Sequence, residues 1–266
     1  MTALQSIILG IIQGLTELLP VSSSAHLNIF PWLLGWSEIP DSFDIALHFG
    51  TLLAITIFFF RDWLDLISSG FKKLVKKKDS VNGRMFWYIV IATIPAGILG
   101  IILEKVSEKI FNTMNKEMLA ISGALIIMGI ILYLVDEKCK TRVRYEKINF
   151  KQAFLIGISQ ALAAAFPGTS RSGITMTVAR GLKIDRESAA KFSFLLSTPM
   201  IAAAVLVSVK DFVFNTEFVL GVLSSFIVGI LVIKFLLEYL KKGSFKVFAI
   251  YRVVLGLVII GFVIFR

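Results

Sequence analysis

Long runs of apolar residues, separated by short polar connections, divide this chain into its predicted elements. A helix of roughly 17–25 apolar residues is long enough to cross the hydrocarbon core of a bilayer. Six runs meet that length: Phe43–Phe60, Met85–Leu103, Met118–Val135, Ala189–Val209, Phe218–Leu237 and Val247–Phe265. The pattern therefore predicts an all-α integral membrane protein in which residues 1–266 form a single transmembrane domain.

Two further apolar segments are broken by proline and hydroxyl-bearing residues. Thr2–Leu19 stops at Pro20 and three serines, and the next apolar segment, Leu27–Leu34, is too short to cross. After Pro167, Ile174–Leu182 is short in the same way. Irregular backbone at membrane depth is tolerated only where protein buries it or where it lines a polar cavity. Each broken segment therefore predicts a re-entrant helical hairpin, and such a pair points to a central binding site.

The two broken segments also resemble each other in sequence. Gly10–Leu27 reads GIIQGLTELLPVSSSAHL and Gly157–Ile174 reads GISQALAAAFPGTSRSGI, with six of eighteen positions identical, among them Ser23 with Ser170. This predicts an internal repeat, with residues 1–147 as the first copy and 148–266 as the second. Each copy is expected to hold one hairpin and three transmembrane helices. Because three spans is an odd number, the copies are expected to have inverted topology.

The distribution of charge predicts the orientation of these spans. If the first hairpin enters from outside, the cytoplasmic connections hold 21 Lys and Arg residues and the outer connections hold four. This asymmetry follows the positive-inside rule and accounts for the net charge of +10 without a nucleic-acid partner. With 56% hydrophobic and 17% charged residues, the chain is expected to contact membrane lipids. The basic run Lys72–Lys78 is interpreted as part of a solvated cytoplasmic loop near anionic headgroups.

The first hairpin contains a carboxylate in an apolar stretch. Gln13 and Glu17 are four residues apart, so they share one helix face. Glu17 lies one turn before the proline break, and ionisable residues at membrane depth are functional hypotheses by default. The alternative is a glutamate that reaches the membrane interface.

Hydroxyl groups and a histidine follow Glu17 closely. Ser22 and Ser23 occupy the turn, and His26 falls where the short second helix begins. Their proximity to a carboxylate favours a chemical role. His48, the other histidine of the chain, lies in the next predicted span, where a packing or supporting role is favoured.

The second hairpin has the pattern of a phosphate site. Its turn, PGTSRSG from Pro167, leads into a helix N-terminus, where free N–H groups and the helix dipole favour anions. Arg171 is a cation whose insertion at membrane depth costs roughly 2.5–3.5 kcal/mol, and a phosphate partner would offset that cost. A salt bridge to Glu17 is a compatible alternative. The residues expected to contact the substrate in this hairpin are Gly168, Thr169, Ser170, Ser172, Gly173 and Thr175.

Several other chemistries find no support in the sequence. The single Cys139 excludes an intrachain disulfide and a cysteine metal cluster. The chain has no Walker A loop, Rossmann fingerprint or zinc-protease motif, which argues against ATP-driven transport. No carboxylate cluster builds a protein cage for Mg²⁺ or Ca²⁺, but Glu17, substrate phosphates and water together could hold such a divalent cation.

The chain resembles the BacA-type undecaprenyl-diphosphate phosphatases, also called bacitracin-resistance proteins. The resemblance runs the whole length and rests on QGLTELLPVSSSAH at Gln13–His26 and PGTSRSGIT at Pro167–Thr175. The family motif has Glu or Gln where this chain has Gln13, so Glu17 is expected to supply the carboxylate alone. The resemblance implies a multi-pass bacterial plasma-membrane enzyme with inverted repeats and an outward-facing site. It also implies dependence on a divalent cation, bacitracin resistance, and recycling of the carrier lipid for peptidoglycan and cell-wall synthesis.

Phosphoryl transfer depends mainly on positioning and on stabilisation of charge. We expect Arg171 and the N–H groups around Ser170–Gly173 to hold the terminal phosphate of a polyprenyl diphosphate. Ser23, activated by Glu17 or His26, is the preferred nucleophile. His26 as nucleophile, or as base for a water molecule, is the alternative. Gln13, Ser22 and the hydroxyl groups of the second hairpin are expected to orient the diphosphate or the cation.

Two other functions remain open at this stage. A polyprenyl-phosphate flippase or secondary transporter would also use inverted repeats and polar hairpins near the membrane midplane. A purely structural membrane protein would not need Glu17, His26 and Arg171 at depth. The sequence does not define the oligomeric state, and a homodimer is one alternative.

Overall fold

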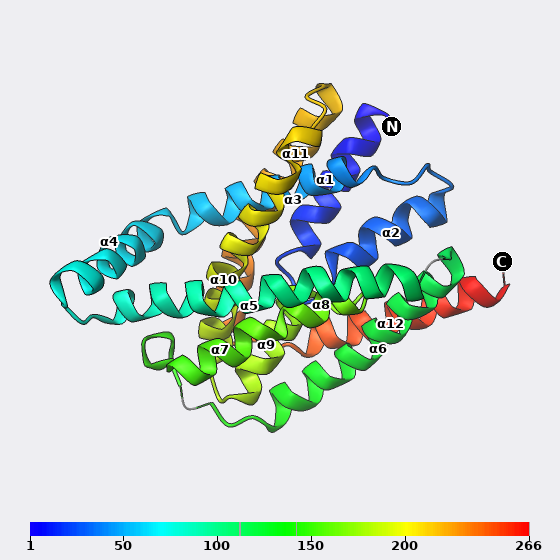
Figure 1. Ribbon diagram of the computed structural model, residues 1–266. Coiled ribbons are helices and arrows are strands. Elements are labelled where there is room, and N and C mark those ends of the chain that lie inside the picture. The colour runs from blue at the N-terminus through cyan, green and yellow to red at the C-terminus, as the bar shows by residue number, and fades with distance from the viewer. Residues whose placement is uncertain (112, 142, 266) are drawn as a thin grey trace.

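The computed structural model describes residues 1–111, 113–141 and 143–265, and within these ranges it is built from helices joined by short turns (Figure 1). The helices are α1 (Ala3–Thr16), α2 (Ser23–Leu34), α3 (Asp41–Phe58), α4 (Phe60–Lys76), α5 (Val81–Ile110), α6 (Met114–Lys138), α7 (Phe150–Ser159), α8 (Ala161–Ala165), α9 (Arg171–Gly181), α10 (Arg186–Ser208), α11 (Thr216–Leu240) and α12 (Lys246–Phe265), with short 3₁₀ turns η1 (Tyr145–Lys147) and η2 (Val209–Asp211).

Six of these helices are long and apolar enough to cross a membrane, namely α3, α5, α6, α10, α11 and α12. They coincide with the six runs predicted from the sequence, so the prediction of an all-helical integral membrane protein is confirmed. The helices α1, α2, α7, α8 and α9 are shorter, with lengths of 5 to 14 residues. They surround the two breaks, at Pro20 and at Pro167.

The basic run Lys72–Lys78, interpreted from the sequence as loop, lies largely in α4. This helix is amphipathic: Leu66 and Gly70 are buried, Gly70 against Phe86 of α5, whereas Lys72 and Lys76 are exposed. In Figure 1 it projects at the far left, beside the start of α5. The connection to α5 is held by Asp79, which pairs with Lys73 and Arg84. The Lys73 hydrogen bond, with the Arg84 guanidinium, lowers the pKa of Asp79.

The long helices pack closely because small residues lie at their contacts. Helix α1 lies against α11, where a Cβ added at Gly14 would be 2.8 Å from the carbonyl oxygen of Ser225. Helix α6 lies against α12, where a Cβ added at Gly256 would be 2.8 Å from the carbonyl oxygen of Ser122. Close approach of helix backbones through small residues is typical of packing in membranes.

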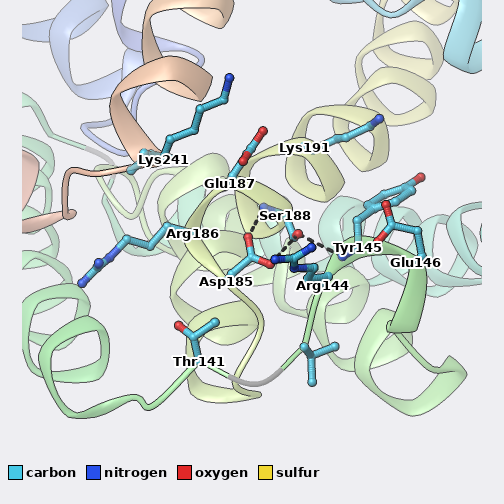
Figure 2. Close-up of a pocket in the computed structure, with 12 residues that line it drawn as sticks. Thr141, Arg144, Tyr145, Glu146, Asp185, Arg186, Glu187, Ser188, Lys191 and Lys241 are labelled. Carbon is cyan, nitrogen blue, oxygen red and sulfur yellow. Dashed lines mark hydrogen bonds between the residues drawn. The ribbon is translucent and has the colours of Figure 1, made fainter.

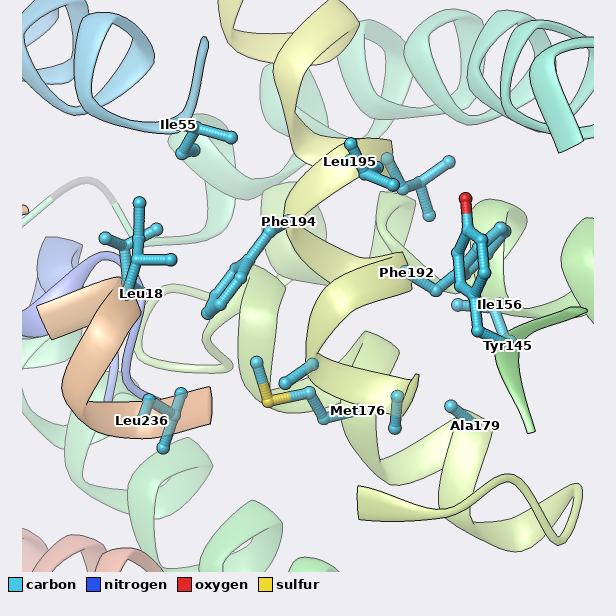
Figure 3. Close-up of a cluster of buried hydrophobic side chains, with 14 of the residues drawn as sticks. Leu18, Ile55, Tyr145, Ile156, Met176, Ala179, Phe192, Phe194, Leu195 and Leu236 are labelled. Atoms are coloured by element: carbon cyan, nitrogen blue, oxygen red, sulfur yellow. The ribbon is translucent and has the colours of Figure 1, made fainter. Parts of the chain in front are cut away.

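The largest apolar core surrounds α10 (Figure 3). Phe192, Phe194 and Leu195 of this helix are almost fully buried. They pack in one cluster with residues from α3, α9, α11 and the first hairpin, among them Ile55, Met176, Leu236 and Leu18. The core therefore holds the first proline break and α9, which follows the second break, against the same helix.

A buried ion pair lies where α6, α9 and α12 meet. Arg180 Nε donates to Asp136 Oδ1 over 2.7 Å, and both side chains are almost fully buried. Arg186 Nε also pairs with Asp136, at 2.9 Å, and the backbone N–H of Phe245 donates to Asp136 Oδ2 over 3.1 Å. This carboxylate thus has a donor on each oxygen, as a buried charge requires.

Candidate functional site

The two segments predicted to form hairpins meet at Glu17. Arg171, the first residue of α9, donates through Nη2 to Glu17 Oε1. Ser172 Oγ lies 3.0 Å from the carbonyl oxygens of both Glu17 and Leu19. The structure therefore joins two motifs that are more than 150 residues apart in sequence. The salt bridge considered from the sequence is present.

Donors surround the Glu17 carboxylate, which is only 7% exposed. Ser23 Oγ donates to Oε2 over 2.5 Å, and Gln13 Nε2 donates to the same oxygen over 3.3 Å. His48 Nε2 lies 3.4 Å from it. Of the predicted site residues, Gln13, Ser23, Arg171 and Ser172 thus lie directly against Glu17.

The two turns have closely matching backbone geometry. Ser22 and Ser170 both have positive φ angles, 78° and 69°, and each caps the helix that follows. Ser22 Oγ accepts from the N–H of Ala25, and Ser170 Oγ accepts from the N–H of Gly173. In cap geometry, Ser170 therefore corresponds to Ser22, whereas the sequence match paired it with Ser23. The two pairings differ by one residue because the second turn has one more residue between its proline and its cap.

This shift places Ser23 and Arg171 at the first position of their respective helices. Both donate to the same carboxylate. A nucleophile candidate and a phosphate-binding candidate therefore occupy equivalent places in the two turns, on either side of Glu17.

His26 has partners other than Ser23. Its Nδ1 lies 2.6 Å from the carbonyl oxygen of Ser22, and its Nε2 lies 2.7 Å from the hydroxyl of Tyr251. A carbonyl oxygen can only accept, so Nδ1 donates and Nε2 is left to accept from Tyr251. The ring also stacks on Tyr251, with centroids 5.7 Å apart. His26 therefore joins α2 to α12, whereas Ser23 points to Glu17.

Other predicted contacts of the second hairpin have structural partners. Thr175 Oγ1 lies 2.6 Å from Ser193 Oγ of α10, and the Gly173 N–H is taken by Ser170. Gly168 has φ 87°, and a Cβ there would lie 2.7 Å from the Ile121 carbonyl oxygen, so only glycine fits.

Arg252 was missed as part of this site, because the sequence placed it in a cytoplasmic connection. It is fully buried in α12. Its guanidinium donates to the carbonyl oxygens of Thr169 at 2.9 Å and Gly168 at 3.1 Å in the second turn, and of Pro20 at 3.3 Å in the first. Further bonds reach α6. Its position inside the apolar run Val247–Phe265 could have identified it, because a cation at membrane depth is also what singled out Arg171.

A divalent cation would find few protein ligands here. Across residues 1–111, 113–141 and 143–265, no group of three His, Cys, Asp or Glu side chains could hold one. Gln13 Oε1 is buried without a hydrogen-bond partner, one helical turn from Glu17. Gln13 Oε1 and the Glu17 carboxylate are the oxygen donors that a cation such as Mg²⁺, which keeps water and shares substrate phosphates, could use.

A cavity of about 550 Å³ lies on the side of α2 where Ser24 is found. It is bounded by α2, the start of α3, the connection between them and the start of α6. Four carboxylates line it: Glu38, Asp41, Asp44 and Glu117. The cavity, called the acidic cavity below, thus lies beside the first turn.

A second cavity, of about 750 Å³, lies at the start of α10, and its lining includes no residue of the two hairpin turns (Figure 2). Arg186 pairs with Asp136, Lys191 with Asp62, and Lys241 with Glu238. Burial raises the pKa of Tyr145 on its wall. Arg144 also lines this cavity. Because three of these four cations have carboxylate partners, the two broken segments remain the stronger candidate site.

The fold and the site together define a class of protein: an all-helical, multi-pass membrane protein with a buried Ser–Glu–Arg cluster between two broken helical segments. Comparison with known proteins gives the family. Residues 6–258 match the family model described as bacitracin resistance protein BacA. The chain belongs to that family.

Curated relatives match over nearly their full lengths. The undecaprenyl-diphosphatase of Caldicellulosiruptor bescii is 47% identical over 100% of this chain and 99% of its own. The undecaprenyl-diphosphatase of Pelotomaculum thermopropionicum is 48% identical over 98% of this chain and 96% of its own. That of Moorella thermoacetica is 44% identical over 98% of both chains.

Proposed function

We propose that this protein hydrolyses undecaprenyl diphosphate to undecaprenyl phosphate and inorganic phosphate, and so recycles the carrier lipid for cell-wall synthesis. The observation that supports this most is the contact of Ser23 and Arg171 with the two oxygens of Glu17. A hydroxyl, a base and a cation within one buried cluster are the groups that phosphoryl transfer to a serine requires. The names of the full-length relatives support the same activity. Bacitracin resistance agrees with the family.

In the proposed reaction, Ser23 Oγ attacks the terminal phosphorus of the diphosphate and its proton passes to Glu17. The bond from that phosphorus to the bridging oxygen breaks, and undecaprenyl phosphate leaves. Water then attacks the phosphoserine. As the bond between phosphorus and Ser23 Oγ breaks, Glu17 returns its proton to Ser23 Oγ, and phosphate leaves with both protons of the water. Glu17 is favoured over His26 as the base because Ser23 donates to Glu17, whereas both His26 nitrogens have other partners.

Arg171 would turn from Glu17 to the terminal phosphate when substrate enters. A guanidinium binds phosphate with two parallel hydrogen bonds, which compensates the lost ion pair. Gln13 and Glu17 would hold a divalent cation shared with the substrate, and that cation would neutralise phosphate charge. Ser22, Ser170, Ser172, Gly173 and Thr175 would then shape the turns around the phosphates, and Gly168 and Thr169 would join them to Arg252.

We also propose that residues 1–147 and 148–266 are inverted repeats, each with a re-entrant hairpin and three spans. In support, α1 packs on α11 while the matching α7 and α8 pack on α5, the counterpart of α11. Gln13 and Gln160, which match in the repeat, are both buried with an unpaired amide oxygen. The charge asymmetry supports an extracytoplasmic site in a bacterial plasma membrane.

Phosphate release from undecaprenyl diphosphate by the purified protein in detergent tests this function. The parent is expected to release one phosphate per lipid with Mg²⁺ or Ca²⁺ and to lose activity with a chelator. Glu17→Ala and Arg171→Ala are expected to remain folded and inactive. If the parent binds the lipid but releases no phosphate, hydrolysis is refuted and a flippase or transporter becomes the better account.

A further inference from the structure

A histidine contacts the Glu17 carboxylate from a helix that is part of neither broken segment. His48 of α3 has its Nε2 3.4 Å from Glu17 Oε2. Its Nδ1 lies 2.9 Å from the Asp44 carbonyl oxygen and 3.6 Å from Asp44 Oδ2. Both ring nitrogens therefore face oxygen acceptors, one on the Asp44 side and the other on Glu17.

The position of His48 along α3 is fixed from its other side. Thr51 Oγ1 donates to the carbonyl oxygen of His48 over 2.9 Å. The neighbouring Leu47 carbonyl accepts from Ser225 Oγ of α11 over 2.8 Å, and Gly50 lets the α11 backbone approach. The backbone of α3 around His48 is thus held by its packing on α11.

Glu17 needs such support because its side chain has competing partners. Arg171 pulls on Oε1, whereas Oε2 must stay directed at Ser23. Position 13 supplies only a neutral amide, which lies 3.3 Å from Oε2. His48 is the group that approaches Oε2 from α3, opposite the cation on Oε1.

We propose that His48, oriented by Asp44, is a positioning residue that keeps Glu17 Oε2 directed at Ser23 while Arg171 moves to the substrate. This inference rests on the proposed hydrolysis. Asp44 also lines the acidic cavity, so the Asp44–His48 pair forms the connection between that cavity and Glu17. Neither residue contacts the reacting phosphorus in this account.

The test compares four variants with the parent in steady-state phosphate release. His48→Ala is expected to lower kcat by about 10- to 100-fold, the usual effect of losing a residue that orients a catalytic group, with KM within about twofold. His48→Gln keeps an amide N–H in the place of Nε2 and is expected to recover most of kcat. Asp44→Asn should lower kcat less than His48→Ala. Asp41→Asn, on the same wall of the cavity, is the matched control and should keep the parent kcat.

The outcomes separate this inference from the function on which it rests. A parent that releases no phosphate overturns the hydrolysis and the inference together. With an active parent, unchanged kcat in His48→Ala overturns the inference alone. Equal losses in His48→Ala and His48→Gln, together with a lower Tm in both, would also overturn it, because they would assign His48 to folding.

Discussion

At the scale of single residues, the burial of charge decides which side chains belong to the site. Glu17, Arg171 and Ser23 could be selected from the sequence because polar groups at membrane depth need partners. The same argument applies to Arg252, but its place near the start of an apolar run assigned it to a loop. The roles of His26 and Ser23 could not be separated by sequence, since both follow Glu17 closely. The structure separates them, because Ser23 is hydrogen-bonded to Glu17 and His26 to Tyr251.

Substitution of Ser23 tests its role as the nucleophile. Ser23→Ala removes the attacking hydroxyl and should reduce phosphate release by at least about 100-fold, in the range typical of losing a positioned proton-transfer partner. Ser24→Ala is the matched control, because Ser24 lines the cavity and its hydroxyl lies 3.2 Å from Ser22 Oγ rather than on Glu17. Full turnover by Ser23→Ala would rule out Ser23 as the nucleophile and leave His26 or a water molecule.

Arg252 should contribute more to stability than any exposed cation of the chain. Arg252→Ala leaves buried carbonyl oxygens of both turns without this donor, at a cost of about 1–3 kcal/mol for each unsatisfied group. The expected result is a clear fall in Tm in detergent, with loss of activity. Lys242→Ala, an exposed cation just before α12, is the control and should leave Tm unchanged. A parent-like Tm for Arg252→Ala would contradict the role of Arg252 in joining the turns.

At the scale of helices, the six spans were predictable because their apolar runs match the thickness of a bilayer. Helix α4 was not, because its amphipathic pattern was interrupted by lysines and was interpreted as loop. The sequence also did not predict that Ser22 and Ser170 are the equivalent helix caps, because the two turns differ in length by one residue. The pairs of helices that pack together could not be predicted from the sequence, because small residues allow close contact with any neighbouring helix.

The contact of α1 with α11 provides the prediction at this scale. A Cβ at Gly14 would lie 2.8 Å from the Ser225 carbonyl oxygen, so Gly14→Ala must push α1 away and displace Gln13 and Glu17. Both Tm and phosphate release should fall. At Gly123 of α6 an added Cβ meets nothing within 4 Å, so Gly123→Ala should be neutral or stabilising by up to about 1 kcal/mol through helix propensity. The same Tm change in both variants would refute close packing as the reason for Gly14.

At the scale of the whole molecule, the orientation in the membrane follows from the distribution of Lys and Arg. Cys139 is the single cysteine, so Cys139→Ser gives a background for labelling. In intact bacteria a membrane-impermeant maleimide should label Glu38→Cys, on the acidic cavity, and should label Lys78→Cys only after permeabilisation. Labelling of Lys78→Cys alone in intact cells would contradict the proposed orientation and would show that the site faces the cytoplasm.

The central claim is that two distant hairpins form one catalytic site, and a double-mutant cycle on Glu17 and Arg171 measures it most directly. Phosphate release is compared among the parent, Glu17→Gln, Arg171→Lys and the double variant, all folded. Residues that act as a unit lose activity non-additively, so the double variant should be little worse than the poorer single one. Losses that multiply, or full activity in Arg171→Lys, would contradict a shared site.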